Sequence, residues 1–115
     1  MPVKIKRIYE PAAPEDGQRI LVDRLWPRGV AKAEAHIDLW LKEVAPSADL
    51  RRWFGHKPER WAEFQKRYLA ELKDSPAFED LRRWVRGKPT TLLYGARDET
   101  HNQARVLADR LNGDD

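Results

Sequence analysis

A chain of 115 residues is long enough for one compact domain with one modest core, and we expect a radius of gyration near ~13 Å. Its 22 lysines and arginines against 19 acidic residues give a formal net charge of +3, too small an excess for a basic tail. The absence of cysteine excludes disulfides, thiolate nucleophiles and cysteine-based metal centres. Residues 1–10 lack the apolar stretch of a secretion signal, and no run approaches the ~18 apolar residues of a membrane span, so we expect a cytoplasmic protein.

The first half of the chain predicts two strands and two short helices. Residues 3–9 alternate between apolar side chains and lysines, which favours a strand. Residues 19–25 contain a continuous apolar run, which is typical of a strand covered on both faces. The apolar spacing across residues 37–44 predicts a short helix, and Ser47 is a suitable N-cap for a second helix over residues 48–54.

The second half predicts three helices and one more strand. A helix follows Pro58 with an apolar stripe, and a further helix opens at Ser75. Residues 90–94 form an apolar strand, and the last helix begins near Thr100 and stops at Gly113. Strands separated by helices predict a single α/β domain over residues 1–115, with a small, mainly parallel sheet of three to four strands flanked by about five helices.

Polar clusters follow two of these strands where each strand ends. One cluster comprises Asp23, Arg24, Trp26 and Arg28, and the other comprises Tyr94, Gly95, Arg97, Asp98, His101 and Asn102. Ligands of open α/β sheets bind beyond the carboxyl ends of the strands. If the two strands are parallel neighbours, both clusters lie at one edge of the sheet, and the sequence predicts a cleft that accepts an anion.

The residue types suggest how such a cleft would work. The Arg24 and Arg28 guanidinium groups could grip a phosphate or carboxylate, helped by N–H groups at the start of the last helix. Gly95 allows close backbone approach, and Trp26, Tyr94, Arg97 and Asn102 complete the predicted ligand-binding set. We expect a small anionic or nucleotide-like ligand and no cofactor.

The same clusters supply candidate catalytic groups. Asp23 or Asp98 could accept a proton with help from His101, and hydrolysis is the least demanding reaction because it needs no cofactor. Simpler roles are open for each residue. Asp23 could pair with a neighbouring arginine, Asp98 could cap a turn, and His101 could be an ordinary surface histidine. Asp98 and His101 could also hold a metal weakly, but we predict no metal site.

Two other function classes stay open. Basic and aromatic residues interleave in Arg51–Phe54 and in Arg82–Lys88, a pattern that can grip phosphates and stack bases of nucleic acid. Residues 61–115 hold 10 basic and 10 acidic side chains, so that half of the chain is not strongly positive. The third class is a protein-interaction module without catalysis, which would expose an apolar patch built from tryptophans. The sequence does not indicate the oligomeric state.

Several motifs resemble one known family. Leu21–Gly29, Ala45–Ser47 with Leu50–Phe54, and Thr91–Tyr94 through Asp98 and Asn102 are similar to the YeaO-like group of domain-of-unknown-function family 488. The resemblance covers nearly the whole chain and implies a small bacterial cytoplasmic α/β protein, with no activity established for the family. Gly95 and Arg97 stand where the family pattern has alanine and lysine. The arginine keeps the charge, and neither change removes the predicted cleft.

Overall fold

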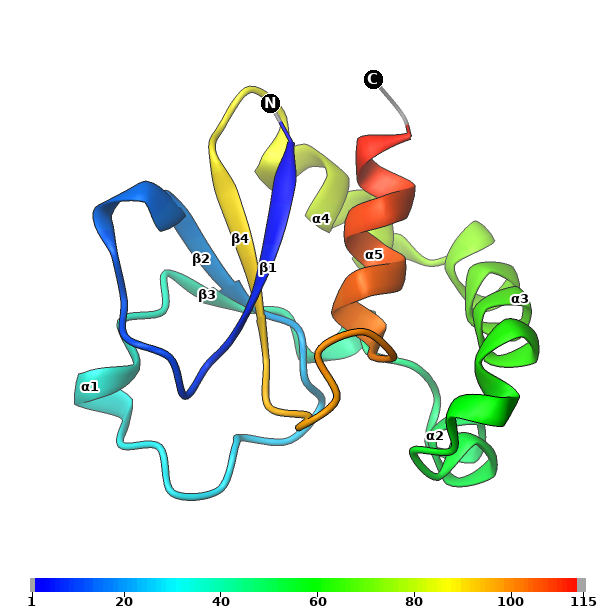
Figure 1. The fold of residues 1–115 in the computed structure, drawn as a ribbon. Coiled ribbons are helices and arrows are strands. Elements are labelled where there is room, and N and C mark those ends of the chain that lie inside the picture. Colours follow the sequence, from blue (N-terminus) through cyan, green and yellow to red (C-terminus); the bar gives the residue numbers. More distant parts are fainter. Residues whose placement is uncertain (1, 114–115) are drawn as a thin grey trace.

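A four-stranded parallel sheet is the centre of the computed structural model, which describes residues 2–113 (Figure 1). The strands are β1 (Val3–Arg7), β2 (Gln18–Leu21), β3 (Leu39–Trp40) and β4 (Thr90–Tyr94). Their order is β1-β4-β2-β3, and every neighbouring pair is parallel. The α/β fold with a small parallel sheet is therefore confirmed, and the two strands that carry the polar clusters, β2 and β4, are neighbours.

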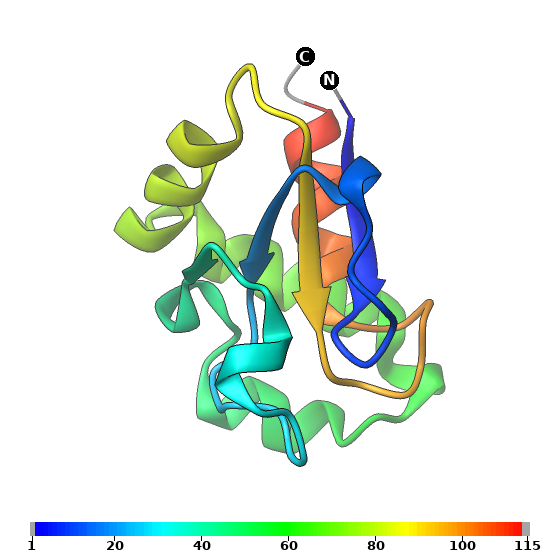
Figure 2. The same ribbon diagram turned by 90° about the vertical axis from the view of Figure 1, so that its left-hand side faces the viewer.

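The helices lie on both sides of this sheet. They are α1 (Lys32–Ala35), α2 (Ala48–Phe54), α3 (Trp61–Lys73), α4 (Pro76–Val85) and α5 (Gln103–Asn112). Three 3-10 segments, Pro14–Asp16, Lys42–Val44 and Pro58–Arg60, join them. Figures 1 and 2 place α2 to α5 on one side of the sheet and α1 on the other. The Cα radius of gyration is 13.3 Å.

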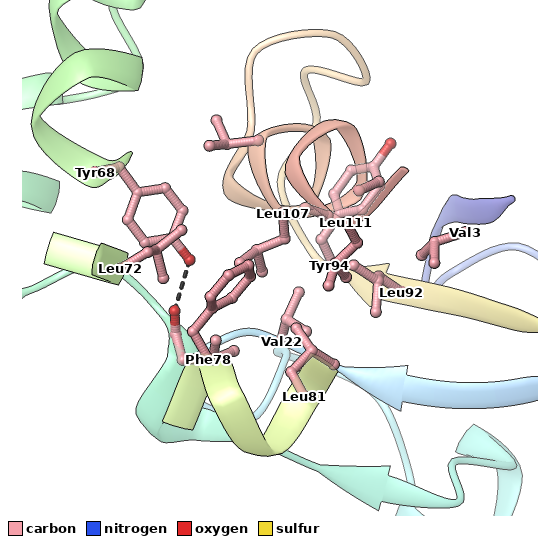
Figure 3. Packing of buried hydrophobic residues seen from close by; sticks show 14 of the residues in the cluster. Val3, Val22, Tyr68, Leu72, Phe78, Leu81, Leu92, Tyr94, Leu107 and Leu111 are labelled. Carbon is pink, nitrogen blue, oxygen red and sulfur yellow. Dashed lines mark hydrogen bonds between the residues drawn. The ribbon is translucent and has the colours of Figure 1, made fainter. Parts of the chain in front are cut away.

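The main core lies between the sheet and helices α2 to α5 (Figure 3). Apolar side chains of alternate strand residues point into it, including Ile20, Leu92 and Tyr94, and the helices contribute residues such as Leu81 and Leu107. The Tyr68 hydroxyl donates a hydrogen bond of 2.6 Å to the Val44 carbonyl, which satisfies a polar group inside the core. Burial on this scale fixes the register of the central strands and thereby the positions of the loops that follow them.

A smaller apolar cluster on the opposite face holds the loop after β2. Its buried members are Ile8, Leu21, Ala35 and Leu93. Trp26 and Trp40 pack against this cluster, and their ring centroids lie 5.4 Å apart in an edge-to-face arrangement. The indole N–H of Trp40 donates to the Asp23 carbonyl at 2.7 Å, and that of Trp26 donates to the Val30 carbonyl at 2.7 Å. Residues 23–30 are therefore fixed by packing and hydrogen bonds.

Two predicted helix positions are wrong. No helix spans residues 37–44, because the backbone there pairs with β2. The Asp38 and Leu41 N–H groups donate to the carbonyls of Arg19 and Leu21, at 2.8 and 2.9 Å. The last helix begins at Gln103 rather than near Thr100, since the Asn102 side chain is the N-cap. The short helix α1 was not predicted at all.

The other predicted elements differ less from the structure. Strands β1 and β2 end at Arg7 and Leu21, earlier than the predicted residues 9 and 25. The predicted N-caps Ser47 and Ser75 are confirmed, each accepting a hydrogen bond from a backbone N–H of its own helix. Within residues 2–113, the helices are too short or too polar to cross a membrane.

Candidate functional site

A cavity of about 540 Å³ opens at the carboxyl ends of β2 and β4. We call it the large cavity. Four separate parts of the chain contribute most of its wall, namely residues 23–28, 45–46, 51–56 and 95–103. Five of the predicted site residues line it: Asp23, Arg24, Trp26, Arg28 and Gly95. The two predicted polar clusters therefore meet at one edge of the sheet.

A second cavity of about 150 Å³, the small cavity, adjoins the first. His101 and Asn102 lie on its wall, together with the apolar side chains Phe54 and Phe64. The two cavities share Pro46, Arg51, His56, Ala96 and Gln103. Because five wall residues are common to both, the two cavities are adjacent, and the large one carries three arginines while the small one has an aromatic wall.

Asp23 connects the two central strands to the last helix. Its Oδ2 accepts the Gly95 N–H at 2.9 Å, and its Oδ1 accepts a hydrogen bond from the Gln103 side-chain amide. Burial raises the pKa of Asp23 to about 6, against the lowering effect of these two donors and of the nearby Arg51 charge. Asp23 is therefore partly protonated in mildly acidic solution. Gly95 suits its place, because a Cβ there would lie 3.0 Å from Asp23 Oδ2.

Arg51 is the cation at the junction of the two cavities. It projects from α2, and its guanidinium makes no hydrogen bond or ion pair with any residue between 2 and 113. The Arg51 Nε atom is buried and has no acceptor. Buried N–H groups almost always have a partner, and leaving one without a partner costs free energy. An anion in the cavity would supply the missing acceptor.

Arg24 and Arg28 add positive charge to the same wall. Arg24 donates from Nη2 to the Ala45 carbonyl at 3.2 Å, and its Nη1 lies 3.8 Å from the Glu43 carboxylate. Its Nε is buried without an acceptor, as in Arg51. Arg28 is exposed, and its carbonyl accepts the Tyr9 hydroxyl at 2.8 Å, which holds the loop at the cavity rim. Main-chain hydrogen bonds therefore help to place both arginines, and Arg24 keeps a buried N–H group without an acceptor among residues 2–113.

The Asp98 carboxylate organises the turn before α5. Its Oδ1 accepts the N–H groups of Thr100 and His101, both at 2.9 Å, and its Oδ2 lies 2.9 Å from His101 Nδ1. Hydrogen bonds from the His101 backbone and ring lower the pKa of Asp98 to about 2. The Asn102 side chain donates to the Asp98 carbonyl and accepts the Arg105 N–H. Asp98 and Asn102 thus hold the turn and the helix start, as the simpler interpretation predicted for Asp98.

Two predicted ligand-binding residues lie away from both cavities. Tyr94 points into the main core, where burial raises its pKa, because residues of a strand alternate between faces and Tyr94 shares the face of Leu92 (Figure 3). Arg97 is exposed and lies on neither wall. The described residues 2–113 contain no group of three or more His, Cys, Asp or Glu side chains that could hold a metal ion.

Comparisons with known proteins place this chain among relatives. A family model described as "Inactive DUF488-N3 subclade" matches residues 2–114. The chain belongs to the DUF488 family. It is 46% identical to "Uncharacterized protein YeaO" of Escherichia coli (strain K12), over 96% of this chain and 97% of that protein. It is 45% identical to "Uncharacterized protein Rv3073c" of Mycobacterium tuberculosis (strain ATCC 25618 / H37Rv), over 96% of this chain and 94% of that protein. No solved structure matches the chain.

Sequence reasoning missed four polar residues of the cavity walls in this DUF488 chain: Tyr9, Arg51, His56 and Gln103. Arg51 was assigned to a nucleic-acid face instead. In the sequence, His56 could have been noticed because it lies between Gly55 and Pro58, in the loop that joins two predicted helices. The structure holds it in the left-handed conformation, with φ of 56°, which non-glycine residues rarely adopt. Such backbone strain is concentrated at functional sites, and it sets the His56 ring on the wall of both cavities.

Proposed function

We propose that this DUF488 chain binds a small anion at the carboxyl edge of its sheet. One observation carries the proposal. The Arg51 guanidinium lines a cavity of about 540 Å³ and has no hydrogen-bond or ion-pair partner among residues 2–113. A cation in this position attracts an anion from solvent, and the anion gains several charge-assisted hydrogen bonds.

The charge of the cavity wall supports an anionic ligand. Arg24, Arg28 and Arg51 line the large cavity, and Asp23 is the one carboxylate among the described residues that line it. Burial raises the Asp23 pKa to about 6, so below that pH the side chain is mostly neutral and no longer opposes an anion. The cavity volume is in the range of small-molecule sites, which are about 300–1,000 Å³.

The arrangement favours binding over hydrolysis. The two carboxylate oxygens of Asp23 accept hydrogen bonds from Gly95 and Gln103, which tie this side chain to the backbone after β4 and to α5. The Asp98–His101 pair, which we predicted as a candidate proton acceptor, serves the turn before α5. The word "Inactive" in the description of the matching subclade agrees with a binding role.

Isothermal titration calorimetry with inorganic phosphate tests the proposal. We expect saturable binding that weakens at least about tenfold in Arg51→Met, because the free guanidinium is lost while its apolar stem is retained. The matched control is Arg52→Met, which removes an exposed arginine from the same helix that pairs with Asp49. If both variants bind phosphate as the original chain does, Arg51 does not hold the anion.

Nucleic-acid binding and a protein-interaction role stay predictions. Arg52 and Arg83 form ion pairs with Asp49 and Asp80 on their own helices, which reduces the charge that those faces would offer to phosphates. Trp84 is 42% exposed beside this surface. Salt-sensitive oligonucleotide binding that is lost on changing Arg82, Arg83 and Arg86, and kept in Arg51→Met, would favour nucleic acid over the anion.

A further inference from the structure

The small cavity has the size and lining of a site for one ring. Its volume is about 150 Å³, and Phe54, Phe64, Pro46 and Ala96 provide its apolar wall. A cavity of about 150 Å³ with apolar walls accepts one benzene molecule. The small cavity therefore fits a single six-membered ring and is too small for a ring together with an attached sugar.

The wall beside this space is built from stacked aromatic side chains. The ring centroids of Phe54 and Phe64 lie 4.4 Å apart, and those of Phe64 and Trp61 lie 5.6 Å apart. The His101 ring meets Trp61 edge-on, with centroids 5.2 Å apart. A flat aromatic ring gains favourable contact from such a wall beyond the area that it buries.

Three of the five polar side chains on the wall of the small cavity, His101, Asn102 and Gln103, make hydrogen bonds within the protein, and the other two are Arg51 and His56. The Asn102 side chain caps α5, and the side-chain amide of Gln103 donates a hydrogen bond to Asp23. His101 Nδ1 lies within hydrogen-bond distance of Asp98 Oδ2. A nucleobase has several donors and acceptors on its edges, and leaving them buried without partners costs free energy. A ring without polar substituents avoids that cost. The lining therefore favours a simple aromatic ring over a nucleobase.

Arg51 lies where the ring space meets the charged cavity, because it lines both. A charged group attached directly to a ring in the small cavity would reach the Arg51 guanidinium. Three arginines against one carboxylate favour a dianion over a monoanion. Building on the proposed anion site, we infer that the ligand is a small aryl phosphate, with its ring in the small cavity and its phosphate at Arg51.

A series of ligands tests this assignment by calorimetry at pH 7.5, using inorganic phosphate, methyl phosphate, phenyl phosphate and uridine monophosphate. Phenyl phosphate is expected to bind at least about tenfold more tightly than methyl phosphate, since only its ring buries apolar area in the small cavity. Equal affinities that both depend on Arg51 would overturn the aryl assignment and leave the anion site standing. Tightest binding of uridine monophosphate would also overturn it. If no phosphate compound binds, the anion site itself is wrong.

A variant at the shared wall gives a second measurement. Ala96→Leu adds bulk between the two cavities, and the Ala96 backbone is held by a hydrogen bond of 2.9 Å from the Arg7 side chain. The ratio of the phenyl phosphate affinity to the methyl phosphate affinity should fall to about twofold or less. Because Ala96 also lines the large cavity, this ratio, and not the affinity for inorganic phosphate, is the readout. Ala70→Leu, an equal addition on the exposed face of α3, is the matched control and should change neither affinity. If Ala96→Leu still binds phenyl phosphate at least about tenfold more tightly than methyl phosphate, the ring does not lie in the small cavity.

Discussion

Two aspartates flank strand β2, and their surroundings are opposites. Asp16, before the strand, accepts from Lys6 at 3.0 Å and from Arg19 at 2.5 Å, and Arg19 donates its other N–H groups to the carbonyls of Ala35 and His36. Burial alone would raise the pKa of Asp16, but hydrogen bonds from Ala13, Lys6 and Arg19 outweigh it and lower the pKa. Asp23, after the strand, accepts from uncharged donors, and its pKa is raised to about 6.

The difference separates a structural network from the proposed binding site. At the amino end of β2, each charge has its partner inside the protein, so nothing is left to attract a ligand. At the carboxyl end, Arg51 and the Nε atom of Arg24 lack acceptors and face a cavity. The same residue types therefore pair with one another at one end of the strand and leave buried arginine N–H groups without acceptors among residues 2–113 at the other.

Removing the charge of Asp16 should have the largest effect. Asp16→Asn leaves Lys6 and the buried Arg19 without a charged partner, and we expect the free energy of unfolding to fall by about 3–5 kcal/mol. Urea denaturation at pH 7 measures it. Asp49→Asn breaks an exposed ion pair and should cost less than about 1 kcal/mol. If the free energy of unfolding falls equally in the two variants, the Asp16 network does not stabilise the fold more than an exposed ion pair does.

The contribution of Asp23 to stability should fall as the pH rises, whereas that of Asp16, whose pKa is lowered, is kept at high pH. Its folded pKa of about 6 lies above the usual value of 3.8, so the folded chain holds more protons between these values and its stability falls as pH rises from 4 to 6. The shift corresponds to about 3 kcal/mol. Asp23→Asn, which resembles the protonated acid, should be more stable than the original chain at pH 8 and of similar stability at pH 4, by urea denaturation. A parallel pH profile in both proteins would contradict the raised pKa.

A methyl group at Gly95 should disturb Asp23 more mildly. The new Cβ would lie 3.0 Å from Asp23 Oδ2, and relief of this contact lengthens the hydrogen bond from the Gly95 N–H. We expect Gly95→Ala to cost about 1 kcal/mol and to raise the Asp23 pKa further, measured by carbon NMR of the carboxyl group. Gly113→Ala, with its nearest contact at 3.4 Å, is the control and should leave that pKa unchanged.

Loss of the Arg51 guanidinium should have the smallest effect on stability. Arg51→Met breaks no hydrogen bond with residues 2–113, so we expect a change within about 0.5 kcal/mol by thermal denaturation. Arg19→Met, which removes the bonds to Asp16, Ala35 and His36, is the matched comparison and should be strongly destabilising. Similar losses in both would show that Arg51 has a structural partner.

The sequence predicted the sheet edge better than the helices. Asp23, Arg24 and Arg28, which line the large cavity, could be placed at the sheet edge because polar residues follow a run of buried strand residues, and that signal needs no knowledge of distant contacts. Residues 37–44 have helical apolar spacing, yet the backbone of residues 38–41 bonds to β2, and a tertiary contact of this kind overrides a local pattern. Tyr94 was assigned to the site although strand alternation turns it into the core.

Arg51 could not be placed from local patterns. It lies on a helix between strands β3 and β4, and the direction that such a helix presents depends on how it packs against α3 and on the turn at Gly55 and His56. The segment Arg51–Phe54 also carries an alternative pattern, basic and aromatic residues together, which pointed to nucleic acid. Only the fold brings Arg51 beside Asp23.

The strand order carries a consequence for how this chain is made. Strands β1 and β2 do not pair with each other, because β4 lies between them and pairs with both. During synthesis, the first half of the polypeptide leaves the ribosome with its central partner still missing. Productive collapse must wait for residues 90–94, and contacts so distant in the chain make folding slow. A truncated product that lacks them would have unpaired strand edges and is a natural substrate for chaperones and proteases.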